Sequence, residues 1–102
     1  MGAVRARVVV VGAGIVGLTA AVRLAEAGLA VRVLARERTP RTTSDVAAAV
    51  WYPFRCGTDA RVAAWGTRTR EVLRGLLSVP DAGVTWVRGT ELHAEARPEP
   101  PW

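Results

Sequence analysis

Apolar and polar residues alternate along the first half of the chain in a pattern that predicts a strand, a helix and a second strand. Arg7–Val11 and Ala30–Ala35 are short apolar runs, and between them Ile15–Ala27 carries apolar side chains at helical spacing. Continuous apolar runs of this length are typical of parallel strands that are covered on both faces. Gly28 is expected to end the helix in a left-handed conformation. The inward face of this helix is predicted at Leu18, Ala21, Val22 and Ala25.

The second half of the chain predicts one longer helix and then a small antiparallel hairpin. A helical pattern begins at Thr58 or Asp59 and extends to about Leu77. Val84–Arg88 and Thr90–Glu95 read as two strands, with Gly89 between them. The apolar stripe of the helix is predicted at Val62, Trp65, Thr69, Val72, Leu73, Leu76 and Leu77.

A polar connection joins the two halves. Arg36–Asp45 contains Pro40, which disfavours a helix. Thr43 or Ser44 is expected to cap a short helical turn that begins at Asp45. Val50–Phe54 is expected to be extended.

Together these elements predict an α/β fold built on a Rossmann-like βαβ unit with an incomplete parallel sheet. The chain has 102 residues, enough for one domain. Doubly wound sheets usually carry more strands than the two predicted here. We therefore expect residues 1–102 to be a truncated domain, or one that needs a partner to complete its sheet.

A glycine motif stands between the first strand and the helix and indicates a nucleotide site. Gly12-Ala13-Gly14-Ile15-Val16-Gly17 supplies glycine at the three positions of a dinucleotide-binding turn. Gly12 allows a sharp turn, Gly14 allows a pyrophosphate to approach the backbone, and Gly17 allows the helix to lie close to the sheet. The N–H groups at Ile15–Gly17 and the helix dipole would then face the phosphates.

The residues after the second strand do not select one cofactor. Glu37 is placed to accept hydrogen bonds from the adenosine ribose, whereas the flanking Arg36 and Arg38 would suit the 2′-phosphate of NADP. The motif alone leaves FAD, NAD and NADP open.

Composition excludes several other functions. The formal net charge is +5, but the arginines are scattered rather than clustered, which argues against a nucleic-acid surface. One cysteine excludes an internal disulfide, and with a single histidine no metal site is expected. The apolar run 8–22 is too short to span a bilayer. These observations favour a soluble, cytoplasmic protein.

The chain resembles the D-amino-acid oxidase family, and the most specific part of the resemblance lies after the second predicted strand. The resemblance rests on Thr39-Pro40, on Thr42–Ala48 (TTSDVAA) with Trp51 and Pro53, and on Glu91–Ala96 (ELHAEA) with Pro98, Pro100 and Trp102. It covers nearly the whole chain and looks like the N-terminal third of such an enzyme. It implies FAD as the cofactor and oxidative deamination of D-amino acids, with oxygen as the acceptor. D-aspartate oxidase, glycine oxidase and a non-catalytic nucleotide-binding fragment remain alternatives.

The resemblance also implies roles for individual residues. Gly12, Ala13, Gly14, Ile15, Val16 and Gly17 would hold the pyrophosphate, and Arg36 and Glu37 would meet the adenosine. Thr42, Thr43 and Ser44 would contact the phosphates and the ribityl chain. Ala48, Ala49 and Val50 would run beside the isoalloxazine. Many family members have glycine at the position of Ala49.

No catalytic residue is expected within these residues, because the family's substrate-binding groups come from its C-terminal part. The chain alone is therefore expected to be inactive toward D-amino acids unless that part is supplied. We also expect Trp65, Val72 and Leu76 to be partly exposed and to promote self-association.

Overall fold

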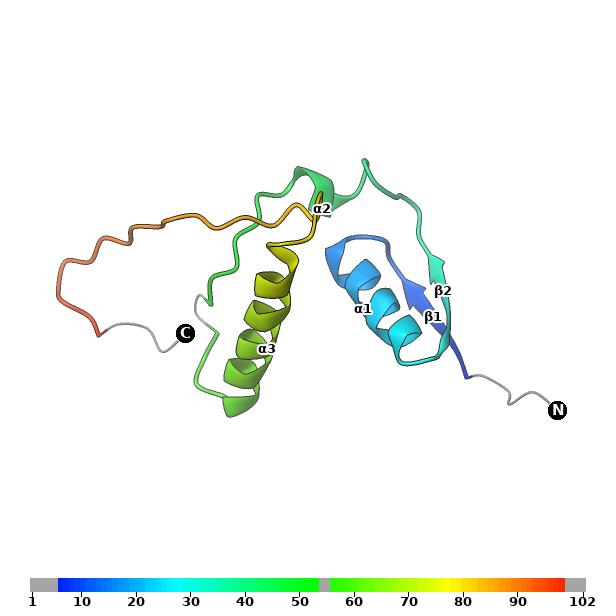
Figure 1. The fold of residues 1–102 in the computed structure, drawn as a ribbon, viewed down its shortest axis with the longest axis horizontal. Helices are drawn as coiled ribbons and strands as arrows, with labels where there is room; N and C mark the ends of the chain where they lie inside the picture. The colour runs from blue at the N-terminus through cyan, green and yellow to red at the C-terminus, as the bar shows by residue number, and fades with distance from the viewer. Residues whose placement is uncertain (1–5, 54–55, 99–102) are drawn as a thin grey trace. The chain divides into compact units, whose positions relative to one another are not determined.

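The computed structural model describes residues 6–53 and 56–98, and these form two compact units, Met1–Ala49 and Val50–Trp102 (Figure 1). The first unit contains β1 (Arg7–Val11), α1 (Ile15–Glu26), β2 (Ala30–Leu34) and the short α2 (Thr43–Val46). The second contains α3 (Ala60–Leu76). The prediction made for Phe54, and the Pro100 and Trp102 positions of the family resemblance, lie outside the described residues.

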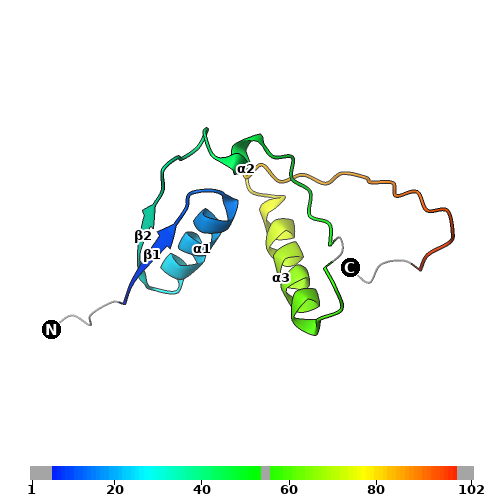
Figure 2. The ribbon, with the colours of Figure 1, turned by 180° about the vertical axis from the view of Figure 1, so that it is seen from behind.

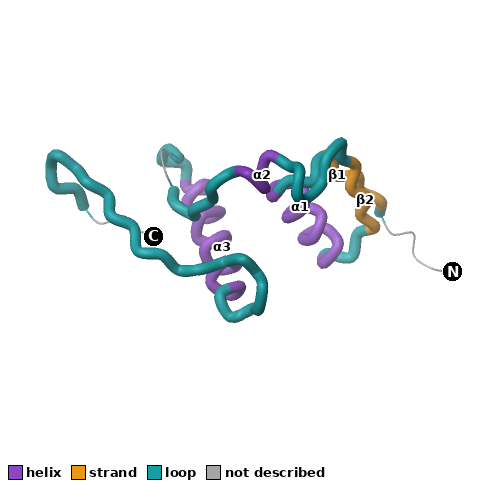
Figure 3. The backbone as a smooth tube through the Cα atoms, turned by 90° about the horizontal axis from the view of Figure 1, so that it is seen from above, coloured by secondary structure: helices purple, strands orange, loops and turns teal. Residues whose placement is uncertain are grey.

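β1 and β2 pair in parallel and form a two-stranded sheet, which confirms the βαβ prediction (Figure 3). Val8 lies opposite Val31 and Val10 opposite Val33, so one face of the sheet is apolar along both strands. α1 connects the two strands and packs on this face (Figure 1). The predicted bounds differ from the observed ones by a single residue at the ends of α1 and β2.

The helix contacts the sheet through a different stripe from the one predicted. Ala21 is buried as expected, but Leu18 and Val22 are 42% and 56% exposed. The half-buried residues on either side of Ala21 are Gly17 and Leu24, four residues before it and three after. Glycine allows the closest approach of a helix to a sheet, so the contact is centred on Gly17 and Ala21, and the larger side chains lie to one side.

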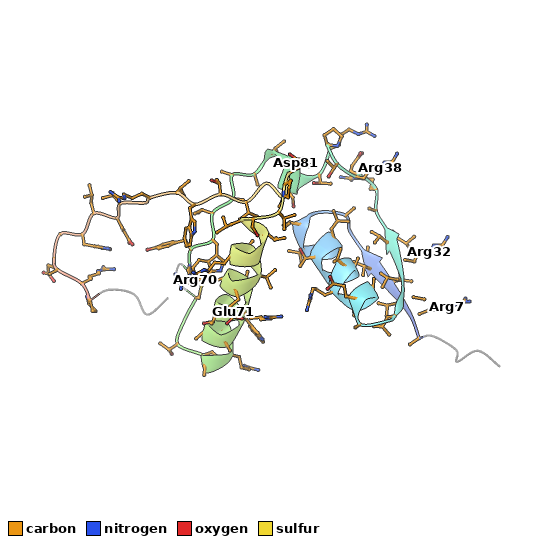
Figure 4. The ribbon with its side chains drawn as sticks, viewed as in Figure 1. Arg7, Arg32, Arg38, Arg70, Glu71 and Asp81 are labelled. Atoms are coloured by element: carbon orange, nitrogen blue, oxygen red, sulfur yellow. The ribbon has the colours of Figure 1, made fainter. Side chains whose placement is uncertain are left out.

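The opposite face of the sheet is open within the described residues. Val9 and Val11 are 54% and 83% exposed, and Leu34 is 48% exposed. Arg7 and Arg32 lie on this same face and project away from α1 (Figure 4). The apolar strands were expected to be covered on both faces, and the described residues cover one of them.

Gly28 ends α1 as the sequence predicts. Its φ is +87°, in the left-handed region. Its N–H donates to the carbonyl of Ala25 (2.9 Å), and the Leu29 N–H donates to the carbonyl of Leu24 (3.1 Å). This pair of bonds is a Schellman motif, and it turns the chain directly into β2.

The second unit confirms the long helix. Asp59 is the N-cap of α3, and its carboxylate accepts a hydrogen bond from the Arg61 N–H (2.8 Å). Trp65 and Val72 are exposed, as the sequence predicts, whereas Leu76 is half-buried. Among the described residues, no helix combines the length and apolar character needed to cross a membrane.

The predicted hairpin is wrong. Residues 84–95 are irregular and form no strand, and residues 84–98 follow an extended, mostly exposed path (Figure 2). An isolated two-stranded hairpin is marginally stable in water. A lone Gly89 also lacks the two-residue turn sequence that fixes a tight hairpin. Residues 84–95 accordingly do not pair with themselves.

Candidate nucleotide-binding site

The glycine turn joins the end of β1 to the start of α1. Gly12 has a φ of +111°, and its N–H donates to the carbonyl of Leu34 (2.7 Å) at the end of β2. Gly14 is the N-cap of α1, with extended backbone angles. A Cβ on Gly17 would clash with the Gly12 carbonyl oxygen and lie 3.6 Å from Val10 Cγ1. The helix is thus held close to the turn and the sheet, as expected for a dinucleotide-binding unit.

The start of α1 presents backbone donors. The Ile15 N–H donates to the hydroxyl of Ser44 (2.9 Å). The N–H groups of Val16 and Gly17 donate to no partner among the described residues. These donors, together with the positive end of the helix dipole, form a suitable place for an anion.

The polar loop places a second group of residues beside this turn. Thr42 is the N-cap of α2, so the prediction that Thr43 or Ser44 caps this helix is wrong. Asp45 accepts hydrogen bonds from both the backbone N–H (2.8 Å) and the hydroxyl (2.6 Å) of Thr42. Because a carboxylate three residues on can accept both bonds, the helix begins at Thr43, two residues earlier than predicted. Ser44 is directed to α1 instead.

The hydrogen bonds from Thr42 lower the pKa of Asp45 below its ordinary value. The Asp45 carboxylate therefore keeps its negative charge at the first turn of α2 to a lower pH than an ordinary aspartate does.

An open depression of about 250 Å³ gathers residues from three segments of the first unit. It is lined by residues 12–14 of the glycine turn, 35–37 after β2, and 41–44 of the polar loop. A second depression, of about 430 Å³, extends along Val33, Arg36 and Arg38 and shares several lining residues with the first. Most of the residues predicted to bind the cofactor therefore lie at one place.

Charge in the first depression is mixed. Arg36 and Arg41 contribute two positive charges, and Glu37 contributes the negative one. Arg41 Nε lies 3.1 Å from Glu37 Oε2. This Glu37 oxygen is buried and accepts no hydrogen bond within the described part of the chain. Arg41 compensates its charge, and a ligand hydroxyl could add a hydrogen bond to the same carboxylate.

The structure does not bring every predicted residue into this site. Ala48, Ala49 and Val50 are exposed and line neither depression. Conversely, the sequence prediction did not include Ala35 or Arg41, which do line it. Their signals are weak in a sequence, since one is a small residue ending an apolar run and the other is one of many scattered arginines.

A separate polar cluster occurs in the second unit. The Tyr52 hydroxyl donates a hydrogen bond to Glu91 Oε2, and His93 Nε2 lies 3.3 Å from Glu91 Oε1. The bond to Glu91 raises the pKa of Tyr52 above its ordinary value. Nearby, the Arg70 guanidinium lies 5.9 Å from the centre of the Trp51 ring. Within the described residues, no group of three His, Cys, Asp or Glu side chains is placed to hold a metal ion.

Comparisons with known proteins agree with the geometry of the first unit. The chain is 54% identical over 101 residues to a D-amino-acid oxidase of Rubrobacter xylanophilus, covering 99% of this chain and 31% of that protein. It is 48% identical over 84 residues to one of Streptomyces coelicolor, covering 82% and 26%. One of Dictyostelium discoideum is 30% identical over 95 residues, covering 90% and 28%.

The chain thus spans less than a third of the length of the curated relatives that it matches. No solved structure gives a significant match. A family model described as "FAD dependent oxidoreductase" matches residues 7–99, which include β1, the glycine turn, all three helices and the loops between them. This chain therefore belongs to the family of FAD-dependent oxidoreductases that includes the D-amino-acid oxidases.

Proposed function

We propose that residues 1–102 form the N-terminal FAD-binding segment of a D-amino-acid oxidase-type flavoenzyme. The observation that carries the proposal is the depression in the first unit, where the glycine turn, the end of β2 and the polar loop come together. The names of the similar proteins support the same cofactor and the same reaction. The substrate groups would come from the part of those proteins that this chain does not match.

The pyrophosphate of FAD would lie at the start of α1. The N–H groups of Val16 and Gly17, which have no partner among the described residues, would donate to its oxygens, and Ala13 and Gly14 would line the depression beside it. Arg36 and Arg41 would add positive charge. The helix dipole, the free donors and the arginines all favour an anion at this point.

The adenosine would lie beside the end of β2. Ribose hydroxyls would donate to the Glu37 carboxylate, one oxygen of which is buried and ion-paired with Arg41. The second depression, along Val33 and Arg38, offers space next to it for the adenine. Glu37 would disfavour the 2′-phosphate of NADP by charge repulsion.

The remaining predicted residues would meet the middle and the far end of the cofactor. Thr42, Thr43 and Ser44 would face the phosphates and ribityl chain from the rim of the first depression. Ala48, Ala49 and Val50 would offer backbone N–H groups to the isoalloxazine. This last assignment rests on the family resemblance.

The proposed reaction is oxidation of a D-amino acid to an imino acid, with oxygen as the final acceptor. FAD supplies the electron chemistry when it is bound. The residues of this chain would bind the cofactor and fix its orientation. Holding the substrate α-carbon at reacting distance is a positioning task, and we assign it to the unmatched part of the relatives.

Titration of this chain with FAD, NAD and NADP tests the proposal. Flavin fluorescence should change on binding, and FAD should bind more tightly than either nicotinamide cofactor. The chain alone should produce no peroxide from D-alanine above the rate of free FAD. Tighter binding of NADP than of FAD would overturn the proposed cofactor.

We further propose a cytoplasmic location, because the single cysteine suits a reducing compartment. The exposed apolar side chains of β1 and α3 would favour self-association of this chain. Sedimentation at increasing concentration would show it.

A further inference from the structure

Ser44 makes a long-range bond to the start of α1. Its hydroxyl accepts the Ile15 N–H at 2.9 Å, across 29 residues of sequence. An N-cap side chain usually satisfies a donor of the first turn, but the N-cap of α1 is Gly14, which has no side chain. Ser44 therefore supplies from the polar loop an acceptor for the first N–H of α1, and the N–H groups of Val16 and Gly17, which an N-cap side chain would serve, keep no partner among the described residues.

The backbone conformation of Gly14 does not require glycine. Its φ and ψ are −80° and −173°, an extended conformation that any L-residue adopts. A Cβ built on Gly14 would instead lie 2.8 Å from Ser44 Oγ, which is too close, and 3.8 Å from Ser44 Cβ, which is an ordinary contact. The atom that excludes a side chain at position 14 is thus the Ser44 hydroxyl.

We infer that Ser44 is a positioning residue for the nucleotide site, and that residue 14 must lack a Cβ so that the Ser44 hydroxyl can reach Ile15. Only the predicted effect on FAD binding rests on the proposed function. The bond joins the loop that carries Thr42 and Thr43 to the helix start that carries the free N–H groups. Because a hydroxyl accepts and donates at once, Ser44 keeps its own O–H available to the depression.

The inference predicts that Ser44→Ala and Gly14→Ala have the same effect in the chain without cofactor. A methyl at position 14 would rotate the Ser44 hydroxyl away, because a serine side chain moves more easily than backbone. Either change should accelerate hydrogen exchange at the Ile15 amide by roughly three- to tenfold, the effect of losing one hydrogen bond. The double variant should be no worse than either single one.

Binding of FAD should follow the same pattern if the site is preorganised by this bond. Each single variant should weaken FAD by roughly three- to tenfold. Gly14→Ala introduced into the Ser44→Ala chain should add little, since the methyl then meets only a Cβ at 3.8 Å. If Gly14 is needed instead for contact with the pyrophosphate, the second change should cause a full further loss.

Two control variants separate this effect from general damage. Gly17→Ala places its methyl against the Gly12 carbonyl group, which cannot rotate away, so Ser44→Ala should not relieve it. Thr43→Ala removes a neighbouring hydroxyl of the depression that has no hydrogen bond within the described residues. Thr43→Ala should therefore leave exchange at Ile15 unchanged while weakening FAD.

The experiment is amide exchange by NMR on this chain and its variants, followed by FAD titration of the same samples. Slow exchange at Ile15 that is lost equally in both single variants supports the inference. Equal exchange at Ile15 in the parent and in Ser44→Ala, or additive losses in the double variant, would overturn it. Absence of FAD binding by the parent chain counts against the proposed function alone, because the exchange data decide the role of Ser44 without cofactor.

Discussion

Substitution of Gly17 by alanine gives the sharpest test of how α1 is held on the sheet. The new Cβ would overlap the Gly12 carbonyl oxygen, lie 2.9 Å from the Gly12 carbonyl carbon and lie 3.6 Å from Val10 Cγ1. Two of these atoms are backbone, and their position is fixed by the hydrogen bond from the Gly12 N–H to Leu34. The clash can be relieved only if α1 moves away from the turn.

The expected change in stability caused by Gly17→Ala follows from two opposing effects. Alanine is favoured over glycine inside a helix by about 1 kcal/mol. Overpacking a close contact costs about 1–3 kcal/mol. Since Ala21 is the buried apolar residue in the described core, an outward shift of α1 also exposes the main contact of this unit. We expect a net loss of about 1–2 kcal/mol in the free energy of opening of α1.

Gly66→Ala is the matched control. Gly66 lies inside α3, and a Cβ at that position meets no atom within 4 Å. The same chemical change should therefore stabilise α3 by about 0.5–1 kcal/mol through helix propensity alone. Hydrogen exchange measured at amides of α1 and α3 separately gives both opening free energies. If Gly17→Ala slows exchange in α1 as Gly66→Ala does in α3, the close approach at Gly12 is wrong.

Three further predictions concern the charged and hydrogen-bonded groups. Glu37→Gln should raise the affinity for NADP relative to FAD by roughly tenfold, the effect expected from removing one like-charge repulsion in a partly solvated site, and competition titration checks it. Because hydrogen bonds from Thr42 lower the pKa of Asp45, the stability that this carboxylate gives to α2 is present above an ordinary aspartate pKa of about 3.9 and is lost as the pH falls through the lowered value. Exchange at the first amides of α2 should show that loss on acidification, and Asp45→Asn should abolish the pH dependence. Tyr52 is the single tyrosine of the chain, so absorbance at high pH reports it alone, and Glu91→Gln should return its raised pKa toward the ordinary value of about 10. The stability that this hydrogen bond provides is present below that ordinary value and is lost as the pH rises through the raised pKa.

The local elements of this fold could be predicted from sequence because each has a local cause. The bounds of β1 follow from an uninterrupted apolar run, and the end of α1 follows from Gly28. The sequence prediction took Thr43 or Ser44 as the cap of α2 and left out Thr42, although all three carry a hydroxyl suited to that role. The choice depends on Asp45, which closes the bond to Thr42. Because Thr42 caps α2, the Ser44 hydroxyl is available to accept the Ile15 N–H, which is 29 residues away in sequence.

The glycines of the turn show more clearly which features a sequence can predict and which depend on tertiary structure. Gly12 could be assigned its role from the motif, because a turn with positive φ is a property of the backbone alone. The motif predicts that Gly14 and Gly17 both exclude a side chain, but it does not name the excluding atom: a Cβ on Gly14 would meet a movable hydroxyl, and a Cβ on Gly17 would meet fixed backbone. A motif records that a side chain is excluded, whereas the atom that excludes it is a property of tertiary structure.

The errors in the predicted inward faces have a common physical origin. Apolar residues mark every surface that is buried in the complete protein. Some of these surfaces are covered by groups that do not belong to this chain. β1 is apolar on both faces, but α1 covers one of them, and Val9 and Val11 remain exposed on the other. Leu18 and Val22 were placed inward for the same reason, since the pattern does not say which partner covers them. Relatives more than three times as long as this chain have further residues available for these surfaces. Supplying the unmatched part of such a relative in trans should therefore protect Val9 and Val11 from solvent and leave the contact between Gly17 and Gly12 unchanged.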